Sequence, residues 1–225
     1  MKRSHVFFCS FLFISFSHFS HALPQYINEF HYDNTGADQF EYVEIAGVAG
    51  SDLSGWHLDF YNGTNGRVYA SWSLSGLIDD EGAGFGALTF SGSAGLQNGP
   101  NDAIALVDSF GALRQFISYE GSLVGTEGAA NGIASQNIGL TENGSTPVGY
   151  SLQLSGVATD SEGFSWQSGV SSFGVLNAGQ AYQTAQQTAA VVQSVNEPQQ
   201  FTLMALALFG LCCRRQRFGV SGLKA

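Results

Sequence analysis

Closely spaced carboxylates and an amide form the first candidate metal site. Asp33, Asn34 and Asp38 lie within one short polar segment, and Glu41 and Glu44 follow it. Oxygen ligands of this kind suit Ca²⁺, which takes about six to eight of them. The spacing does not match an EF-hand loop, and Asp-Asn-Gly-rich segments also form hairpin turns. Both a Ca²⁺ site and a plain turn remain open, and Ca²⁺ is the one cofactor that the sequence suggests.

The middle of the chain contains few residues that could support histidine-based catalysis or zinc binding. Only His31 and His57 lie between residues 22 and 197, and this part holds no cysteine or lysine. A Ser-His-acid triad would need one of these histidines, and a zinc site usually needs about four nitrogen or sulfur ligands. We expect His57 at an exposed strand position and His31 in a surface hydrogen bond with Asp33. The sequence therefore predicts no catalytic residue.

Paired acids and tryptophans offer two further interpretations. Glycoside hydrolysis needs two carboxylates, so a small secreted hydrolase that uses clustered acids is one alternative. Tryptophan faces can stack on sugars, so a carbohydrate-binding module of an exopolysaccharide layer is another. We expect Trp56 and Trp166 in the core and leave Trp72 open between a core position and stacking on a ligand. The acidic run 79–81 is expected to be a solvated loop.

Short runs of alternating apolar and polar residues predict strands to position these side chains. Nine runs have this or a similar pattern: 26–30, 40–46, 56–61, 67–72, 85–90, 103–107, 113–118, 150–154 and 163–167. Turn sequences rich in Gly, Asn and Ser separate them, and no long helical pattern precedes residue 180. The sequence therefore predicts an all-β, antiparallel β-sandwich. The glycine-rich stretch 121–144 fits either a long loop or an irregular edge.

The start of the chain has the pattern of a secretory signal peptide. Lys2 and Arg3 precede the apolar stretch 6–16, and small residues flank His21. The apolar stretch is shorter than the roughly 20 residues of a membrane span. We therefore expect export and removal of the segment by signal peptidase after Ala22.

The end of the chain combines a polar breaker, an apolar run and a basic cluster. These are Asn196, Glu197 and Pro198, the run 201–213, and Arg214, Arg215 and Arg217. The arginines should stay on the cytoplasmic side of a membrane. The segment resembles the PEP-CTERM sorting signals of Gram-negative bacteria, with Asn196 in place of the first proline of the motif. That resemblance implies recognition by an exosortase-like transpeptidase, and an ordinary tail anchor is the alternative. Both hold the precursor at the inner membrane.

The charge of the chain changes once the two ends are set aside. Residues 23–197 contain all eighteen acids but only Arg67 and Arg114 as basic residues, a net charge of −16. Nucleic-acid affinity comes mainly from Lys and Arg that displace counterions from phosphates. Nucleic acid is therefore disfavoured as a partner. The absence of cysteine from this part also excludes a disulfide within it.

Five blocks in order resemble the lamin tail domain. They are Ile27-Asn28-Glu29-Phe30, residues 40–45, residues 52–56, residues 149–154 with Phe164-Ser165-Trp166, and residues 177–180. The resemblance implies an immunoglobulin-like β-sandwich, an interaction or attachment role in exported bacterial proteins, and no catalytic residues.

The expected organisation has five parts. A signal peptide (1–22) precedes a lamin-tail-like β-sandwich (23–180), a linker (181–195), a sorting segment (196–217) and a cytoplasmic tail (218–225). We expect an exported, non-catalytic structural or adhesive protein that is transiently anchored in the inner membrane and then reaches the cell surface or matrix.

Overall fold

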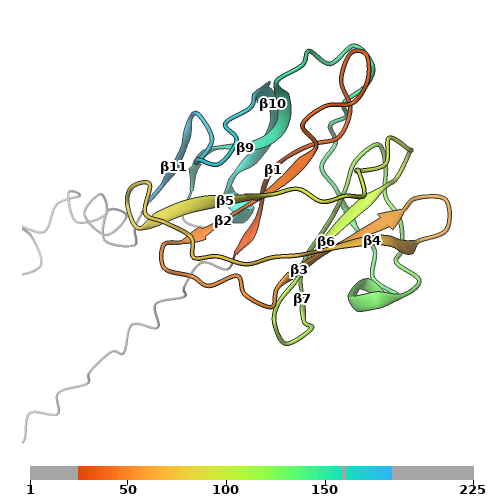
Figure 1. Cartoon of the computed structure of the whole chain (residues 1–225), viewed down its shortest axis with the longest axis horizontal. Coiled ribbons are helices and arrows are strands. Elements are labelled where there is room, and N and C mark those ends of the chain that lie inside the picture. The colour runs from red at the N-terminus through yellow and green to blue at the C-terminus, as the bar shows by residue number, and fades with distance from the viewer. Residues whose placement is uncertain (1–24, 159–160, 184–225) are drawn as a thin grey trace, which may run out of the picture.

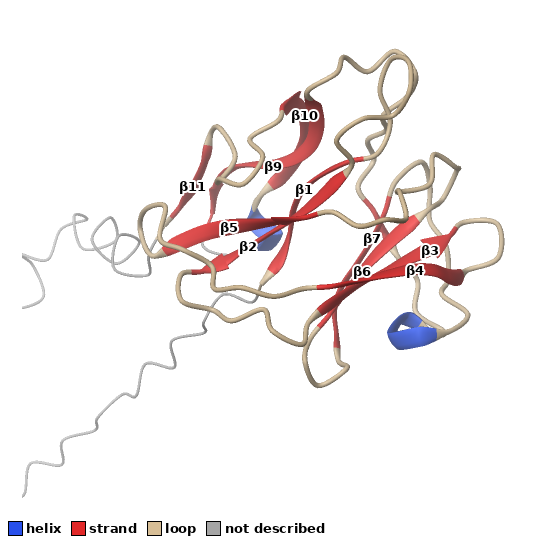
Figure 2. Cartoon of the chain, viewed as in Figure 1, coloured by secondary structure: helices blue, strands red, loops and turns tan. Residues whose placement is uncertain are grey.

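The computed structural model describes residues 25–158 and 161–183, which form two packed β-sheets (Figure 1). In these two ranges, helix is limited to two short 3₁₀ turns, Gly128–Ala130 and Ser161–Gly163 (Figure 2). No helix among the described residues is long and apolar enough to span a membrane. The predicted signal peptide, nearly all of the linker, the sorting segment and the tail lie outside the described residues. The all-β prediction is confirmed.

The first sheet has the strand order β10-β9-β1-β2-β5, with β11 attached to β9. Its strands are β10 (Ser165–Val170), β9 (Tyr150–Ala158), β1 (Tyr26–His31), β2 (Tyr42–Val48), β5 (Phe85–Phe90) and β11 (Gln180–Tyr182). The second sheet has the order β4-β3-β6-β7-β8. Its strands are β4 (Arg67–Ser73), β3 (His57–Asn62), β6 (Ala103–Val107), β7 (Leu113–Ser118) and β8 (Gln136–Asn137). All pairings are antiparallel except β9 with β11 and β7 with β8.

The nine predicted strands are all present, with small differences at their ends. Two strands were not predicted: β8, inside the unassigned stretch 121–144, and β11, which crosses the predicted domain end at residue 180. Both are too short to show an alternating pattern. Tyr182 in β11 is buried, so the folded domain extends at least two residues into the predicted linker.

The main core lies between the sheets and draws residues from both. Its strand residues are Ile27, Phe30, Val43, Ile45 and Leu152 from the first sheet, and Leu58, Phe60, Trp72, Ile104, Leu106 and Ile117 from the second. Alternation places their neighbours on the outer faces of the sheets. The core therefore accounts for one face of each strand only.

The outer face of the first sheet is also covered, which the alternating pattern did not predict. All six residues of β1 are buried, including Asn28, Glu29 and His31. The covering segment is the connection from β10 to β11, residues 171–179, here called the strap. Backbone N–H groups of the strap donate to Glu29 and Glu44, whose side chains lie on this outer face.

Buried carboxylates hold other loops in the same way. Asp102 accepts from the backbone N–H of Gly63 at 2.6 Å and of Gly99 at 3.0 Å. Asp108 accepts from two N–H groups of its own turn and from Arg114 Nε at 2.8 Å. Hydrogen bonds with a charged acceptor are stronger than neutral ones. These contacts fix loops in a domain that has no disulfide.

Candidate functional site

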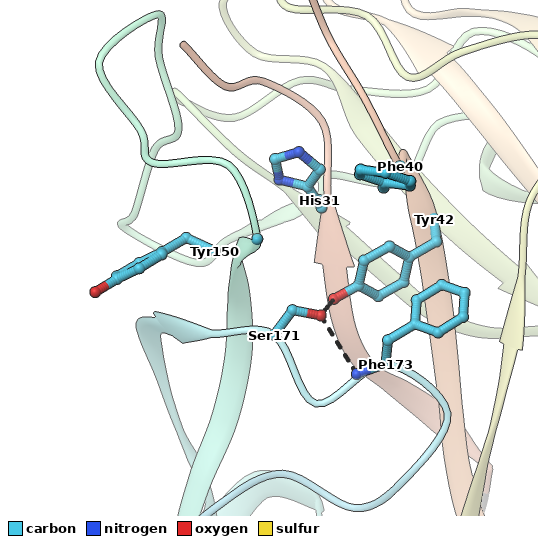
Figure 3. Close-up of a pocket in the computed structure, with 7 residues that line it drawn as sticks. His31, Phe40, Tyr42, Tyr150, Ser171 and Phe173 are labelled. Carbon is cyan, nitrogen blue, oxygen red and sulfur yellow. Dashed lines mark hydrogen bonds between the residues drawn. The ribbon is translucent and has the colours of Figure 1, made fainter.

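An aromatic pocket of about 190 Å³ opens at one end of the first sheet, on the outer face (Figure 3). Its lining residues are His31, Phe40, Tyr42, Gly149, Tyr150, Ser171 and Phe173. His31 ends β1, Tyr42 begins β2, Tyr150 begins β9 and Ser171 follows β10. The pocket therefore lies where the ends of four strands and the strap meet.

Two phenylalanines of the pocket are largely exposed. The side chains of Phe40 and Phe173 are 74% and 60% exposed. Phe173 packs edge-on against Tyr42, with ring centroids 4.8 Å apart and planes at 83°. Phe40 has a φ of 62°, an uncommon and strained conformation for a bulky residue. Phe40 was predicted within a strand, but it lies in the loop before β2. Packing of the core explains neither the exposure of these two aromatic side chains nor the strained backbone of Phe40.

A buried polar network lies beneath the aromatic rings. The Tyr42 hydroxyl donates to Glu29 and lies 2.8 Å from Ser171 Oγ. Glu29 also accepts from Ser151 Oγ at 2.6 Å and from the backbone N–H of Ser172 at 3.0 Å. Burial and the charge of Glu29 raise the pKa of Tyr42, so its hydroxyl keeps its proton and remains a donor. The network fixes the Tyr42 ring in the pocket wall.

Three glutamates hold the strap, each through the backbone N–H of one residue, at every second strap residue from Ser172 to Leu176. Ser172 N–H bonds Glu29, Gly174 N–H bonds Glu44 Oε2 at 2.9 Å, and Leu176 N–H bonds Glu81. Burial raises the pKa of Glu44 to about 8, although its donor partners oppose this rise. Phe173 lies between the first two anchors. Its place at the pocket is therefore set by the carboxylates beneath it.

His31 differs from its prediction. It is buried, and it bonds Glu142 rather than Asp33, with Nδ1 2.9 Å from Glu142 Oε1. Its Nε2 lies 3.1 Å from Asn34 Oδ1, whose amide nitrogen donates to two loop carbonyls. Both ring nitrogens thus face acceptors. Burial lowers the pKa of His31, but the hydrogen bond and charge of Glu142 outweigh it and raise the pKa overall.

This arrangement leaves His31 unsuited to act as a general base toward Ser171. A general base needs an unprotonated nitrogen directed at the nucleophile, whereas both His31 nitrogens face other residues. His57, predicted at an exposed position, is half-buried at the start of β3, with Nε2 3.6 Å from Asp59 Oδ2. His57 is not among the residues that line the pocket.

The residues suggested for Ca²⁺ have other partners. Asn34 Oδ1 bonds His31 and accepts from the backbone N–H of Gln39 at 3.0 Å. Asp38 accepts from Asn98 Nδ2 at 2.8 Å. Burial and the charge of Asp38 raise the pKa of Asp33. Within residues 25–158 and 161–183, no group of three or more His, Cys, Asp or Glu side chains is placed to hold a metal ion.

Of the two alternatives for Trp72, the structure supports the core position and not stacking on a ligand. Its side chain is only 7% exposed and packs against Phe60 in the core, with ring centroids 4.5 Å apart. The other two tryptophans, Trp56 and Trp166, pack against the core as expected but are only partly buried. In the acidic run 79–81, Asp79 and Asp80 are exposed, whereas the Glu81 side chain anchors the strap.

Comparison with known proteins adds no constraint on this pocket. A scan against protein-family models and searches of curated proteins and solved structures find no match to the chain. The function of the pocket is therefore inferred from its geometry.

The titrating groups under the pocket predict that stability falls with rising pH. A group whose pKa is higher in the folded than in the unfolded state stabilises the fold below its unfolded value. The contribution of Glu44 is lost as the pH rises from 4.5 to about 8, and that of His31 is lost as the pH rises above 6.5. Thermal unfolding from about pH 5 to about pH 9 should show a falling midpoint.

The Glu44→Gln variant provides the control for this pH dependence. The glutamine side chain cannot ionise, so the variant should lose less stability than the wild type over the same pH range. Parallel curves for the two proteins would contradict the assignment of this loss to Glu44.

Proposed function

We propose that the protein is an exported, non-catalytic binding module of the cell surface or extracellular matrix. The observation that carries the proposal is the aromatic pocket, in which exposed Phe40 and Phe173 stand on a buried polar network. Concave sites with aromatic walls and a supporting polar shell are typical of ligand recognition. Both nitrogens of His31 in its wall are tied into hydrogen bonds with Glu142 and Asn34, which favours binding over catalysis there.

An immunoglobulin-like sandwich of the lamin-tail type is the proposed fold family. Some of the sequence blocks that resemble the family fall in strands: Ile27 to Phe30 lie in β1, and Ser165 and Trp166 begin β10. Asn177, in another block, is buried and donates to the backbone carbonyls of Asn28 and Leu154. These contacts give the blocks a structural reason to occur together.

Export and sorting form the second part of the proposal, and the sequence supports them. The segment 1–22 has the pattern of a signal peptide, and residues 196–217 resemble a PEP-CTERM signal. Signal peptidase and an exosortase-like transpeptidase would be the processing partners. After processing, the mature domain would bind a surface polysaccharide or protein. The net charge disfavours nucleic acid as a partner.

Mass spectrometry of the protein from its native host tests the sorting proposal. We expect a mature chain that begins at Leu23 and ends near Asn196 or Glu197. Replacement of Arg214, Arg215 and Arg217 by alanine should leave the tail attached. A wild-type chain that extends to Ala225 would refute sorting and favour a permanent anchor.

Retention at the cell surface tests the binding role. The double variant Phe40→Ser with Phe173→Ser should shift the mature protein from the cell fraction to the medium, because it removes the exposed pocket walls. Phe110→Ser is the matched control, since Phe110 is 93% exposed in the turn between β6 and β7. Equal retention of the double variant and the wild type would argue against a binding role for the pocket.

A further inference from the structure

The pocket has few free polar groups. His31 Nδ1 bonds Glu142, His31 Nε2 bonds Asn34, and the Tyr42 hydroxyl bonds Glu29. Ser171 Oγ bonds the Tyr42 hydroxyl and accepts from the backbone N–H of Phe173 at 3.3 Å. A ligand rich in hydroxyls would lose hydrogen bonds to water on entry and would find few partners in the pocket to replace them. The lining instead favours a group that needs no hydrogen bonds.

The size of the pocket limits the group that enters it. Its volume of about 190 Å³ is below the roughly 300–1,000 Å³ of sites for drug-sized ligands. A group of a few heavy atoms therefore fits, with the rest of the molecule in solvent. Phe40, Tyr42 and Phe173 supply three aromatic rings to the lining of this space (Figure 3).

The charges near the pocket favour a cation. The Glu29 carboxylate accepts a hydrogen bond from the Tyr42 hydroxyl, and the charge of His31 is offset by its contact with Glu142. Asp33 and Asp38 lie on the loop that leads to Phe40. Elsewhere Arg114 is paired with Asp108 at 2.6 Å, which leaves Arg67 as the other basic residue of a strongly acidic domain. Such a surface concentrates cations.

We propose that the pocket binds a quaternary ammonium group of the trimethylammonium type, carried by a soluble small molecule. This inference rests on the proposed binding role. Aromatic faces within about 6 Å attract such a cation. A primary ammonium, in contrast, is strongly hydrated and would need acceptors that the lining does not supply. Methyl groups around a positive charge match both the apolar walls and the acidic surroundings.

Titration of the full-length purified protein with choline, followed by NMR chemical shifts, tests the proposal. The control ligand is 3,3-dimethylbutan-1-ol, which has the same shape with carbon in place of the charged nitrogen. We expect choline to bind about tenfold more tightly than this neutral analogue. Equal affinities would overturn the cation assignment but leave a binding module with an apolar pocket. Absence of choline binding would also overturn it, while the retention experiment tests the binding role independently.

Phosphatidylcholine vesicles separate a soluble ligand from a lipid headgroup. The lipid phosphate would approach an acidic surface, so we expect no co-sedimentation with these vesicles. Co-sedimentation that choline competes away would overturn the assignment to a soluble ligand.

Two conservative variants test the aromatic walls. Phe40→Leu and Phe173→Leu keep an apolar side chain but remove the ring face, so each should weaken choline binding roughly threefold to tenfold. Phe110→Leu is the matched control and should bind choline as the wild type does. Wild-type affinity in both pocket variants, with unchanged spectra elsewhere, would contradict the proposal.

Discussion

Buried carboxylates that accept hydrogen bonds from backbone N–H groups are the interaction on which this domain depends. A carboxylate in the protein interior is costly unless its oxygens are satisfied. Here Glu29, Glu44 and Glu142 are each buried and each accepts at least one backbone N–H from a neighbouring segment. The acidic composition thus has a structural use. In a domain without disulfides, these contacts join loops to the sheets.

The pocket is a direct consequence of this constraint. Glu29 and Glu44 fix the strap on the outer face of the first sheet, and the strap carries Phe173 to the Tyr42 ring. Glu142 holds His31 and also accepts from the backbone N–H of Tyr32 at 2.7 Å. The same bonds occupy the polar groups at the pocket, which leaves aromatic surface for a ligand. The same hydrogen bonds therefore stabilise the fold and shape the pocket for the proposed ligand.

The sequence predicted the strands well because one face of each strand enters the core. Alternation in residues 57–62 follows from that face alone, whereas residues 103–107 are apolar throughout and buried on both faces. It could not show that the opposite face would be covered, so the burial of His31 and the role of Glu44 as an anchor were missed. The position of Trp72 stayed open because alternation does not say which face is inward. The pocket joins the ends of four strands, and no spacing along the chain brings Phe40 near Phe173.

Amide hydrogen exchange at the strap tests the role of the buried carboxylates most directly. The amides of Ser172 and Gly174 donate to Glu29 and Glu44, although the strap contains no regular secondary structure at these residues. If the buried carboxylates hold this segment, both amides should be protected nearly as strongly as those of β1 and β9. Exchange as fast as in an open loop would contradict the central claim.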